Sequence, residues 1–197
     1  MTAAAFDTEL PDVEKPATVR TICPVDASAL TARMRQVSDQ AWMSEDERKE
    51  NKFSVFHSTR HIVFRFIEGN NDPRAAYETQ AWVVWRPLVQ PIMDQVAAAC
   101  GLTRPEFPKA MFARLLAGRV IDRHIDGRGS NPKVHKIHVP LVTNSGAIFS
   151  VGDENFHMPV GQAYEVNNIV PHGARNDGAE DRVHLIFEMF ERPRQSG

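Results

Sequence analysis

The second half of the chain is a succession of short strand-like runs separated by turn residues. Its apolar runs are rich in β-branched and aromatic residues, and turns such as Gly152-Asp153-Glu154-Asn155 and Gly161-Gln162 divide them. The predicted strands lie in residues 109–126, with a bend at Ala117-Gly118, and in residues 137–142, 147–151, 156–160, 163–166 and 183–190. Many short strands with turn signals predict a small β-barrel of the cupin or jelly-roll kind.

The first half adds helices to this pattern. Residues 19–25 and 53–67 are predicted strands, and a helix is expected to begin at Asp26. Residues 74–100 have helical character and end before Gly101, although Pro87 and Pro91 predict either two helices or one kinked helix. We therefore expect a mainly β fold with flanking α-helices from the N-terminal half.

Chain length limits the number of domains. A chain of 197 residues is most simply one domain, and a domain of this size buries about 70% of the surface that its unfolded chain exposes. Residues 1–17 are rich in acidic residues and proline and poor in large apolar groups, so we expect a flexible leader there. The predicted organisation is a leader over residues 1–17 and a single domain over residues 18–197.

Charge and cysteine content exclude several classes of protein. The net charge is −2 and no basic block occurs, so nucleic acid is not an expected partner. The longest uncharged apolar stretch, residues 81–85, is far too short to cross a membrane. Two cysteines cannot form a disulfide framework, and we therefore expect a reducing, cytoplasmic location.

A candidate metal site lies in the strand-rich half. His124 and Asp126 form a His-x-Asp pair, and His172 follows after several predicted strands. On an extended segment, residues two apart leave from the same face. Two imidazoles and one carboxylate on one face of an ion form the two-His-one-carboxylate set of non-haem Fe(II) oxygenases. Eight histidines and 25 acidic residues also produce such pairs by chance, so spacing alone leaves a loop histidine at position 172 equally open. His57 and His61 have no acidic residue close by in their segment and are expected to be structural.

Arg182 adds weight to the metal interpretation. It lies shortly after His172, at the start of the apolar run 183–190. An enzyme that holds 2-oxoglutarate on iron needs a buried cation for the far carboxylate of that molecule. Arginine suits this role because its planar guanidinium binds a carboxylate through two hydrogen bonds and keeps its charge.

The order of four segments resembles the aspartyl/asparaginyl β-hydroxylase-type family. The segments are Arg123-His124-Ile125-Asp126, Lys-Ile-His-Val-Pro-Leu-Val-Thr-Asn at 136–144, Val-Pro-His-Gly-Ala-Arg-Asn-Asp at 170–177 and Arg-Val-His-Leu at 182–185, and the similarity spans roughly residues 110–191. The family consists of Fe(II)- and 2-oxoglutarate-dependent oxygenases with a double-stranded β-helix core, and its bacterial relatives include free-proline hydroxylases. The resemblance implies a dioxygenase that uses O₂, releases succinate and CO₂, and hydroxylates an amino-acid residue or a free amino acid.

The resemblance also implies roles for single residues. His124, Asp126 and His172 correspond to the iron ligands and catalytic residues, and Arg182 to the residue that binds the C5 carboxylate of 2-oxoglutarate. His138 and Lys136 fall where family members place further contacts to this co-substrate, although arginine is common at the position of Lys136, which puts that contact in doubt. Some members lack the acid, whereas Asp126 completes the triad here.

The substrate is less well indicated. Arg128 follows the predicted ligands in a polar loop, residues 127–132, and we expect it to bind a carboxylate of a small amino acid or peptide substrate. The alternative from another class is a metal-binding cupin without oxygenase activity, either an isomerase or a small-molecule sensor. Arg182 discriminates between the two, because a sensor has no need for a carboxylate-binding arginine at that position.

Overall fold

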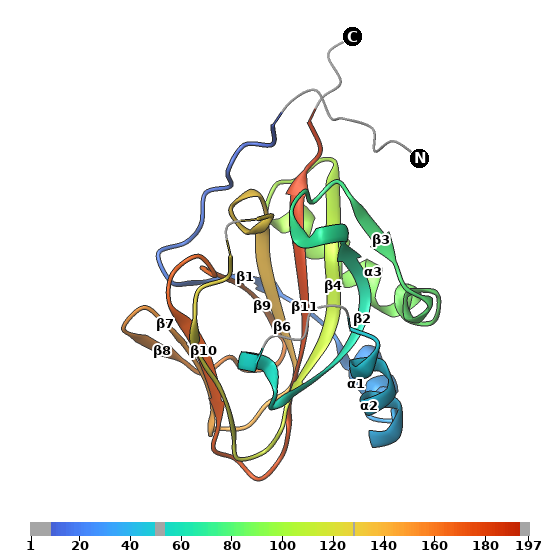
Figure 1. Cartoon of the computed structure of the whole chain (residues 1–197), viewed down its shortest axis with the longest axis vertical. Helices are drawn as coiled ribbons and strands as arrows, with labels where there is room; N and C mark the ends of the chain where they lie inside the picture. The colour runs from blue at the N-terminus through green and yellow to red at the C-terminus, as the bar shows by residue number, and fades with distance from the viewer. Residues whose placement is uncertain (1–8, 50–53, 128, 194–197) are drawn as a thin grey trace.

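Two antiparallel sheets face each other in the computed structural model, which describes residues 9–49, 54–127 and 129–193. The larger sheet has the order β1-β9-β6-β11-β4-β2-β3, and the smaller sheet has the order β5-β10-β7-β8. The larger sheet contains β1 (Val19–Pro24), β2 (Thr59–Ile67), β3 (Ala76–Glu78), β4 (Pro105–Leu115), β6 (His135–Val142), β9 (Gln162–Val166) and β11 (Arg182–Glu191). The smaller sheet contains β5 (Arg119–His124), β7 (Ala147–Val151), β8 (Glu154–Phe156) and β10 (His172–Asn176). Figure 1 shows the smaller sheet beside the larger one, and the two form the expected double-stranded β-helix.

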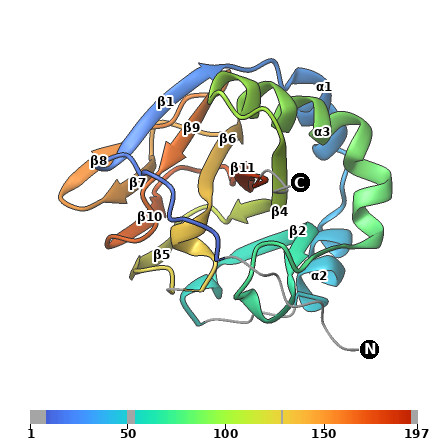
Figure 2. The ribbon, with the colours of Figure 1, turned by 90° about the horizontal axis from the view of Figure 1, so that it is seen from above.

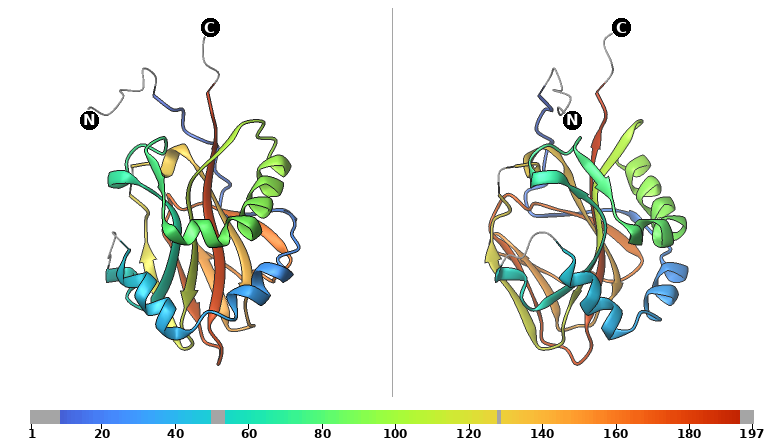
Figure 3. Two further views of the ribbon diagram at one scale, coloured as in Figure 1. Left: turned by 90° about the vertical axis from the view of Figure 1, so that its right-hand side faces the viewer. Right: turned by 45° about the vertical axis from the view of Figure 1, so that its right-hand side comes forward.

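Helices cover only the outer face of the larger sheet. They are α1 (Ser28–Met34), α2 (Asp39–Glu47) and α3 (Gln80–Ala99), with short 3-10 turns η1 (Ser54–Phe56), η2 (Glu68–Asn70) and η3 (Asn131–Lys133). The views in Figures 2 and 3 place α1 and α3 outside this sheet, on the side away from the smaller sheet. The predicted fold class is therefore confirmed: a mainly β core with helices from the N-terminal half. Within the described residues, no helix is long and apolar enough to cross a membrane.

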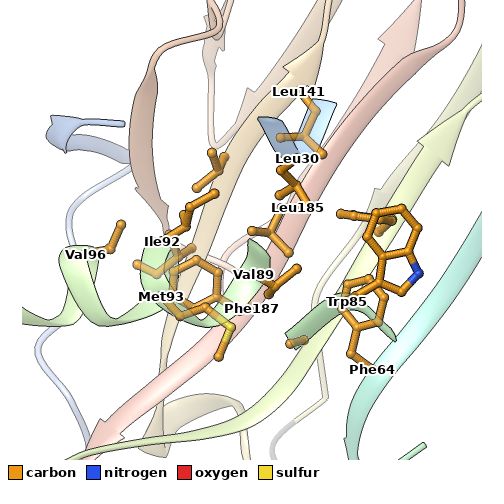
Figure 4. Close-up of a cluster of buried hydrophobic side chains, with 14 of the residues drawn as sticks. Leu30, Phe64, Trp85, Val89, Ile92, Met93, Val96, Leu141, Leu185 and Phe187 are labelled. Atoms are coloured by element: carbon orange, nitrogen blue, oxygen red, sulfur yellow. The ribbon is translucent and has the colours of Figure 1, made fainter. Parts of the chain in front are cut away.

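The alternation of β11 explains why the helices and the cavity lie on opposite faces. Every second residue of this strand, from Val183 to Met189, belongs to the main hydrophobic core. Figure 4 shows Leu185 and Phe187 near Trp85, Val89, Ile92 and Met93 of α3, with Phe64 of β2. The intervening residues Arg182, Ile186 and Glu188 point to the other face and line a cavity between the sheets.

Helix α3 is shorter than expected, and Figure 2 shows that it bends along its length. The predicted helical region 74–100 is divided, because residues 76–78 pair with β2 as β3 and the helix begins only at Gln80. Pro87 and Pro91 both lie inside one continuous helix. Both prolines are exposed, so water can hydrogen-bond to the carbonyl groups that they leave without N–H partners.

Two further features were not expected from the sequence. Strand β10 begins at His172, where a loop histidine had been the open alternative, and it pairs with both β5 and β7. The described part of the expected leader, residues 9–17, lies against the barrel: Leu10 is buried with Val134 and Phe190, and the Val13 amide donates to the Pro132 carbonyl at 2.9 Å. Residues 1–8 lie outside the described part of the chain.

Candidate active site

Neighbouring strands bring the three predicted metal ligands together. His124 ends β5 and His172 begins β10, and the two are direct cross-strand partners. Asp126 follows His124 by two residues, and its backbone N–H donates to the Asn168 carbonyl at 3.0 Å. One ligand atom from each of the three residues lies within 4.8 Å of the other two. The structure therefore places His124, Asp126 and His172 close enough to share one ion.

Backbone carbonyls orient the two imidazoles. His124 Nδ1 lies 2.8 Å from the carbonyl oxygen of Asp122, and His172 Nδ1 lies 2.9 Å from that of Val170. A carbonyl oxygen can only accept, so each Nδ1 carries the proton and each Nε2 keeps its lone pair. These Nε2 atoms lie 3.6 Å and 3.9 Å from Asp126 Oδ1. Outer hydrogen bonds of this kind are typical of metal-ligating histidines.

The two oxygens of the Asp126 carboxylate have different contacts. Its Oδ2 accepts from Lys136 Nζ at 2.6 Å and from Asn168 Nδ2 at 2.9 Å, whereas Oδ1 faces the two histidines. Burial opposes the charge of Asp126, but the charge of Lys136 and the hydrogen bonds from Lys136 and Asn168 hold the pKa of Asp126 well below its usual range. The carboxylate is therefore ionised, with one oxygen held in place and the other facing the imidazoles.

The donor set fits a first-row divalent metal. Two neutral imidazole nitrogens and one carboxylate oxygen are the ligands of the facial triad that binds Fe(II). All three residues line a cavity of about 540 Å³ between the two sheets. Burial lowers the pKa of His172, which favours the neutral form that a metal requires.

Arg182 lies in the same cavity without a carboxylate partner. It is 5% exposed, and among the residues that the structure describes no Asp or Glu forms an ion pair with it. Its Nε and Nη2 atoms lie 2.9 Å and 2.8 Å from the two nitrogens of His184, a neutral side chain. Burial lowers the pKa of Arg182 to about 9. A buried guanidinium without a counter-ion is costly, so this position fits an anionic ligand.

His138 and Lys136, the other expected co-substrate contacts, differ in their surroundings. His138 is 3% exposed, and its Nε2 has no hydrogen-bond partner in the described parts of the chain. Burial, together with Arg182, lowers the pKa of His138 well below its usual range, so the ring is neutral. Lys136 instead binds the metal-facing carboxylate of Asp126 and lies 3.8 Å from Glu188. Arg128, the expected substrate contact, lies outside the described residues.

Sequence patterns missed several residues that support the site. Asn168 donates to both Asp126 Oδ2 and Asn131 Oδ1, each at 2.9 Å. Lys15, from the expected leader, donates to Asn168 Oδ1 at 2.8 Å. His61 has an acidic partner after all, because its Nδ1 lies 2.8 Å from Asp46 Oδ1 across a stretch of chain that the sequence did not connect. None of these residues belongs to a motif, and only the fold brings them together.

Comparison with known proteins gives one sequence match and many structural ones. The family model described as aspartyl/asparaginyl β-hydroxylase matches residues 87–193. No curated protein matches the chain. Because the match covers more than half of the chain, including the triad and Arg182, it supports the resemblance inferred above.

Solved structures resemble the fold at low sequence identity. An oxidoreductase of the 2OG-Fe(II) oxygenase family from Burkholderia pseudomallei is 10% identical, with a TM-score of 0.52 over 94% of this chain and 96% of the other. A prolyl hydroxylase from Trichoplax adhaerens, in complex with a hypoxia inducible factor peptide fragment, is 12% identical with a TM-score of 0.56, over 88% and 84%. HygX from Streptomyces hygroscopicus, with nickel and 2-oxoglutarate bound, is 16% identical with a TM-score of 0.50, over 88% and 83%. At these identities the similarity shows a common fold.

Proposed function

The chain belongs to the aspartyl/asparaginyl β-hydroxylase family, and from this premise we propose that it hydroxylates a free amino acid or a short peptide. Its cofactor is Fe(II), and its co-substrates are 2-oxoglutarate and O₂. The observation that carries the proposal is that one cavity contains both the His-Asp-His cluster and a buried arginine without an acidic partner among the described residues. A 2-oxoglutarate-dependent oxygenase requires both features: a site for the metal and a cation for the far carboxylate of 2-oxoglutarate.

Each residue of the site has a separate proposed role. His124, Asp126 and His172 would hold the iron, and Arg182 would bind the C5 carboxylate of 2-oxoglutarate through two charge-assisted hydrogen bonds. Bound iron and 2-oxoglutarate supply the oxidation, in which one oxygen atom of O₂ enters succinate, CO₂ leaves, and the other oxygen atom enters a substrate C–H bond. The unpartnered Nε2 of His138 would contact the co-substrate, and Lys136 and Asn168 would orient the Asp126 carboxylate.

The substrate is proposed to carry a carboxylate that a cation of the cavity recognises. The sequence suggested Arg128 for this role, and that assignment stays a prediction. The relative from Trichoplax adhaerens is a prolyl hydroxylase bound to a peptide fragment, which supports an amino-acid side chain within a peptide as one form of the substrate. The chain resembles a family whose bacterial relatives include free-proline hydroxylases, and this supports a free amino acid as the other form of the substrate.

Anaerobic metal titration followed by turnover tests the proposal. Wild-type protein should bind one Fe(II) and, in the presence of O₂ and a suitable amino acid or peptide, form succinate together with a product that is one oxygen atom heavier. His172→Ala should lose both properties, whereas His157→Ala, at an exposed histidine outside the cavity, should retain both. Full succinate formation by His172→Ala would remove the oxygenase assignment. Metal binding without any 2-oxoglutarate binding would instead favour a non-oxygenase cupin.

A further inference from the structure

The charged residues of the cavity leave one cation without an assigned partner. Among the described residues, the lining contains four cationic side chains, Lys49, Lys109, Lys136 and Arg182, and two carboxylates, Asp126 and Glu188. Lys136 Nζ is 2.6 Å from Asp126, and Lys109 Nζ is 3.3 Å from Glu188. Arg182 is assigned above to 2-oxoglutarate, whose other carboxylate would bind the metal. Lys49 therefore remains: no described acidic residue lies within ion-pair distance of it, and the charge of Asp46 acts on it only from farther away.

His61, which Asp46 orients, and Phe56 lie next to the Lys49 ammonium. Asp46, at the end of α2, accepts from both the backbone N–H and the Nδ1–H of His61, at 2.9 Å and 2.8 Å. His61 Nε2 is consequently the nitrogen without a proton. Lys49 Nζ lies almost equally far from the two ring nitrogens, 3.4 Å from Nδ1 and 3.5 Å from Nε2. The ammonium also lies 4.9 Å from the centre of the Phe56 ring. Burial lowers the pKa of Lys49 to about 8, although the charge of Asp46 partly opposes this effect.

This ammonium lies close to the metal ligands. The edge of the Phe56 ring meets the His124 ring, with 5.3 Å between the ring centres. One aromatic ring thus separates the Lys49 ammonium from a candidate iron ligand. Lys49, Phe56 and the triad line the same cavity, so the carbons of an amino acid whose carboxylate is bound to Lys49 could extend past Phe56 toward the metal. Fixing a substrate at one end in this way is how an enzyme restricts the oxidation to one carbon.

We infer that Lys49, held by His61 and Asp46, is the residue that binds a carboxylate of the substrate. The inference rests on the proposed function, because it assumes that Arg182 and the metal already hold 2-oxoglutarate. The carboxylate has three possible sources: the α-carboxylate of a free amino acid, the C-terminus of a peptide, or the side chain of Asp or Glu. The chemistry is the same in each case, and the experiment distinguishes them.

Calorimetric titration of protein loaded with Zn(II) and 2-oxoglutarate tests this inference, because zinc does not support turnover. The probes are the twenty common L-amino acids, their C-terminal primary amides, and dipeptides with a free C-terminus. At least one carboxylate should bind wild-type protein about 10- to 100-fold more tightly than the corresponding amide, the range expected for a charged hydrogen bond. That amide is the C-terminal amide for a main-chain carboxylate, and Asn or Gln for the side chain of Asp or Glu. The Lys49→Met substitution should lower the affinity for that carboxylate by a similar factor and leave the affinity for the amide unchanged. The Lys49→Arg variant should bind the carboxylate with intermediate affinity.

Arg48→Met is the matched control. Arg48 is the preceding residue, is exposed, pairs with Glu45 and does not line the cavity, so its loss should change neither affinity. Melting temperatures of all variants separate loss of folding from loss of charge, because methionine keeps an apolar chain over Phe56. Binding retained by the aspartate amide but not by the asparagine amide would identify a side-chain carboxylate as the source.

Two results would overturn the inference: a carboxylate probe that binds Lys49→Met as tightly as wild type, or a panel in which no carboxylate, of the main chain or of a side chain, binds better than the corresponding amide. Binding of Zn(II) and 2-oxoglutarate to the wild-type protein tests the proposed function separately. If wild-type protein takes up neither Zn(II) nor 2-oxoglutarate, the oxygenase assignment fails. If both are taken up and Lys49→Met has no effect, only the role of Lys49 fails.

Discussion

Two backbone carbonyls decide which nitrogen of each ligand histidine faces the cavity. The carbonyls of Asp122 and Val170 each lie two residues before the histidine that they accept from, so the chain orients its own ligands. Asp126 is oriented by side chains instead, through Lys136 and Asn168. Hydrogen bonds of the protein itself thus orient all three proposed ligands, as is typical of residues around a metal site.

The most specific prediction for a single side chain concerns Arg182. Arg182→Met should weaken 2-oxoglutarate binding by about 2–5 kcal/mol, because the C5 carboxylate loses its buried cation. The same variant should unfold at an equal or higher temperature than wild type when no ligand is present, because an uncompensated buried charge has been removed. Calorimetry with 2-oxoglutarate and thermal denaturation measure the two effects.

Arg182→Lys separates charge from geometry. Lysine keeps the positive charge but cannot form the paired hydrogen bonds of a guanidinium, so it should recover only part of the lost affinity. If Arg182→Met bound 2-oxoglutarate as wild type does, or were strongly destabilised in its absence, Arg182 would be a structural residue instead.

The N-terminal segment, residues 9–17, contributes to the site through one side chain. Lys15 Nζ donates to the Val134 carbonyl at 2.5 Å and to Asn168 Oδ1 at 2.8 Å. Because lysine can only donate, it holds the amide oxygen of Asn168 toward itself and the amide nitrogen toward Asp126. Lys15 therefore sets the orientation of a group that binds the metal-ligating carboxylate.

Lys15→Met should consequently weaken metal binding about tenfold, the lower end of the range for residues that orient metal ligands. Titration with Co(II), followed by its visible absorption, gives the affinity. The control is Lys133→Met: Lys133 pairs with Glu9 and Asp12 of the same segment, at 3.1 Å and 2.8 Å, but does not contact Asn168. Equal loss of affinity in both variants would mean that only docking of the segment matters.

Strand β9 is joined to both of its neighbours through Glu165. This side chain is 0% exposed; its carboxylate lies 2.5 Å from Arg20 of β1 and 2.7 Å from His135 of β6. Burial opposes its charge, but the hydrogen bond from His135 and the charge of Arg20 lower its pKa overall. Glu165 thus stabilises the edge of the larger sheet as an ionised group.

The stability that Glu165 contributes should be lost in acid. Its folded pKa lies below the unfolded value of about 4.3, so the contribution is complete above that value and disappears as the pH falls through the folded pKa. Glu165→Gln should lower the free energy of unfolding at pH 7 by on the order of 1–3 kcal/mol and show a smaller further loss between pH 5 and pH 3. Urea denaturation across this range measures both. Glu154→Gln, at an exposed residue of β8, should follow wild type throughout.

The assembled protein places several charges in one cavity that its ligands would complete. Asp126, Lys136, Arg182, Lys109, Glu188 and Lys49 all line it, and the two sheets exclude much of the water that would solvate them. A divalent metal next to Asp126 and a dianion next to Arg182 would compensate charges that the protein alone leaves unbalanced. Ligands should therefore stabilise the whole fold as well as the site.

Removing metal with a chelator should lower the melting temperature, and restoring Zn(II) with 2-oxoglutarate should raise it. At a ligand concentration about 100 times Kd, binding contributes about 2.7 kcal/mol. In a chain of this size that corresponds to a rise of roughly 5–10 °C. In Arg182→Met the metal should still raise the melting temperature, but 2-oxoglutarate should add nothing. An equal response to 2-oxoglutarate in both proteins would contradict its assigned position.

The sequence by itself determined what depends on near neighbours along the chain. The alternation of β11 separates a core face from a cavity face, and the spacing of His124 and Asp126 places both at one strand end. The residue pattern also put forward His172 and Arg182, and the family resemblance then implied their roles as iron ligand and 2-oxoglutarate-binding residue. These features follow from the two-residue repeat of a strand and from short motifs, so they can be recognised without coordinates.

The tertiary structure alone decided which distant residues meet. Lys15, Lys49, His61 and Asn168 belong to no motif, and each acquires its role from a contact across the fold. The pairing of β10 with β5 and β7 could not be predicted, because these strands are far apart in the sequence. Residues 76–78 were predicted to be helical, but in the fold they pair with β2 as a strand. Side-chain hydrogen bonds and charge pairs depend on the positions of atoms from separate strands, and only the packing of the two sheets determines those positions.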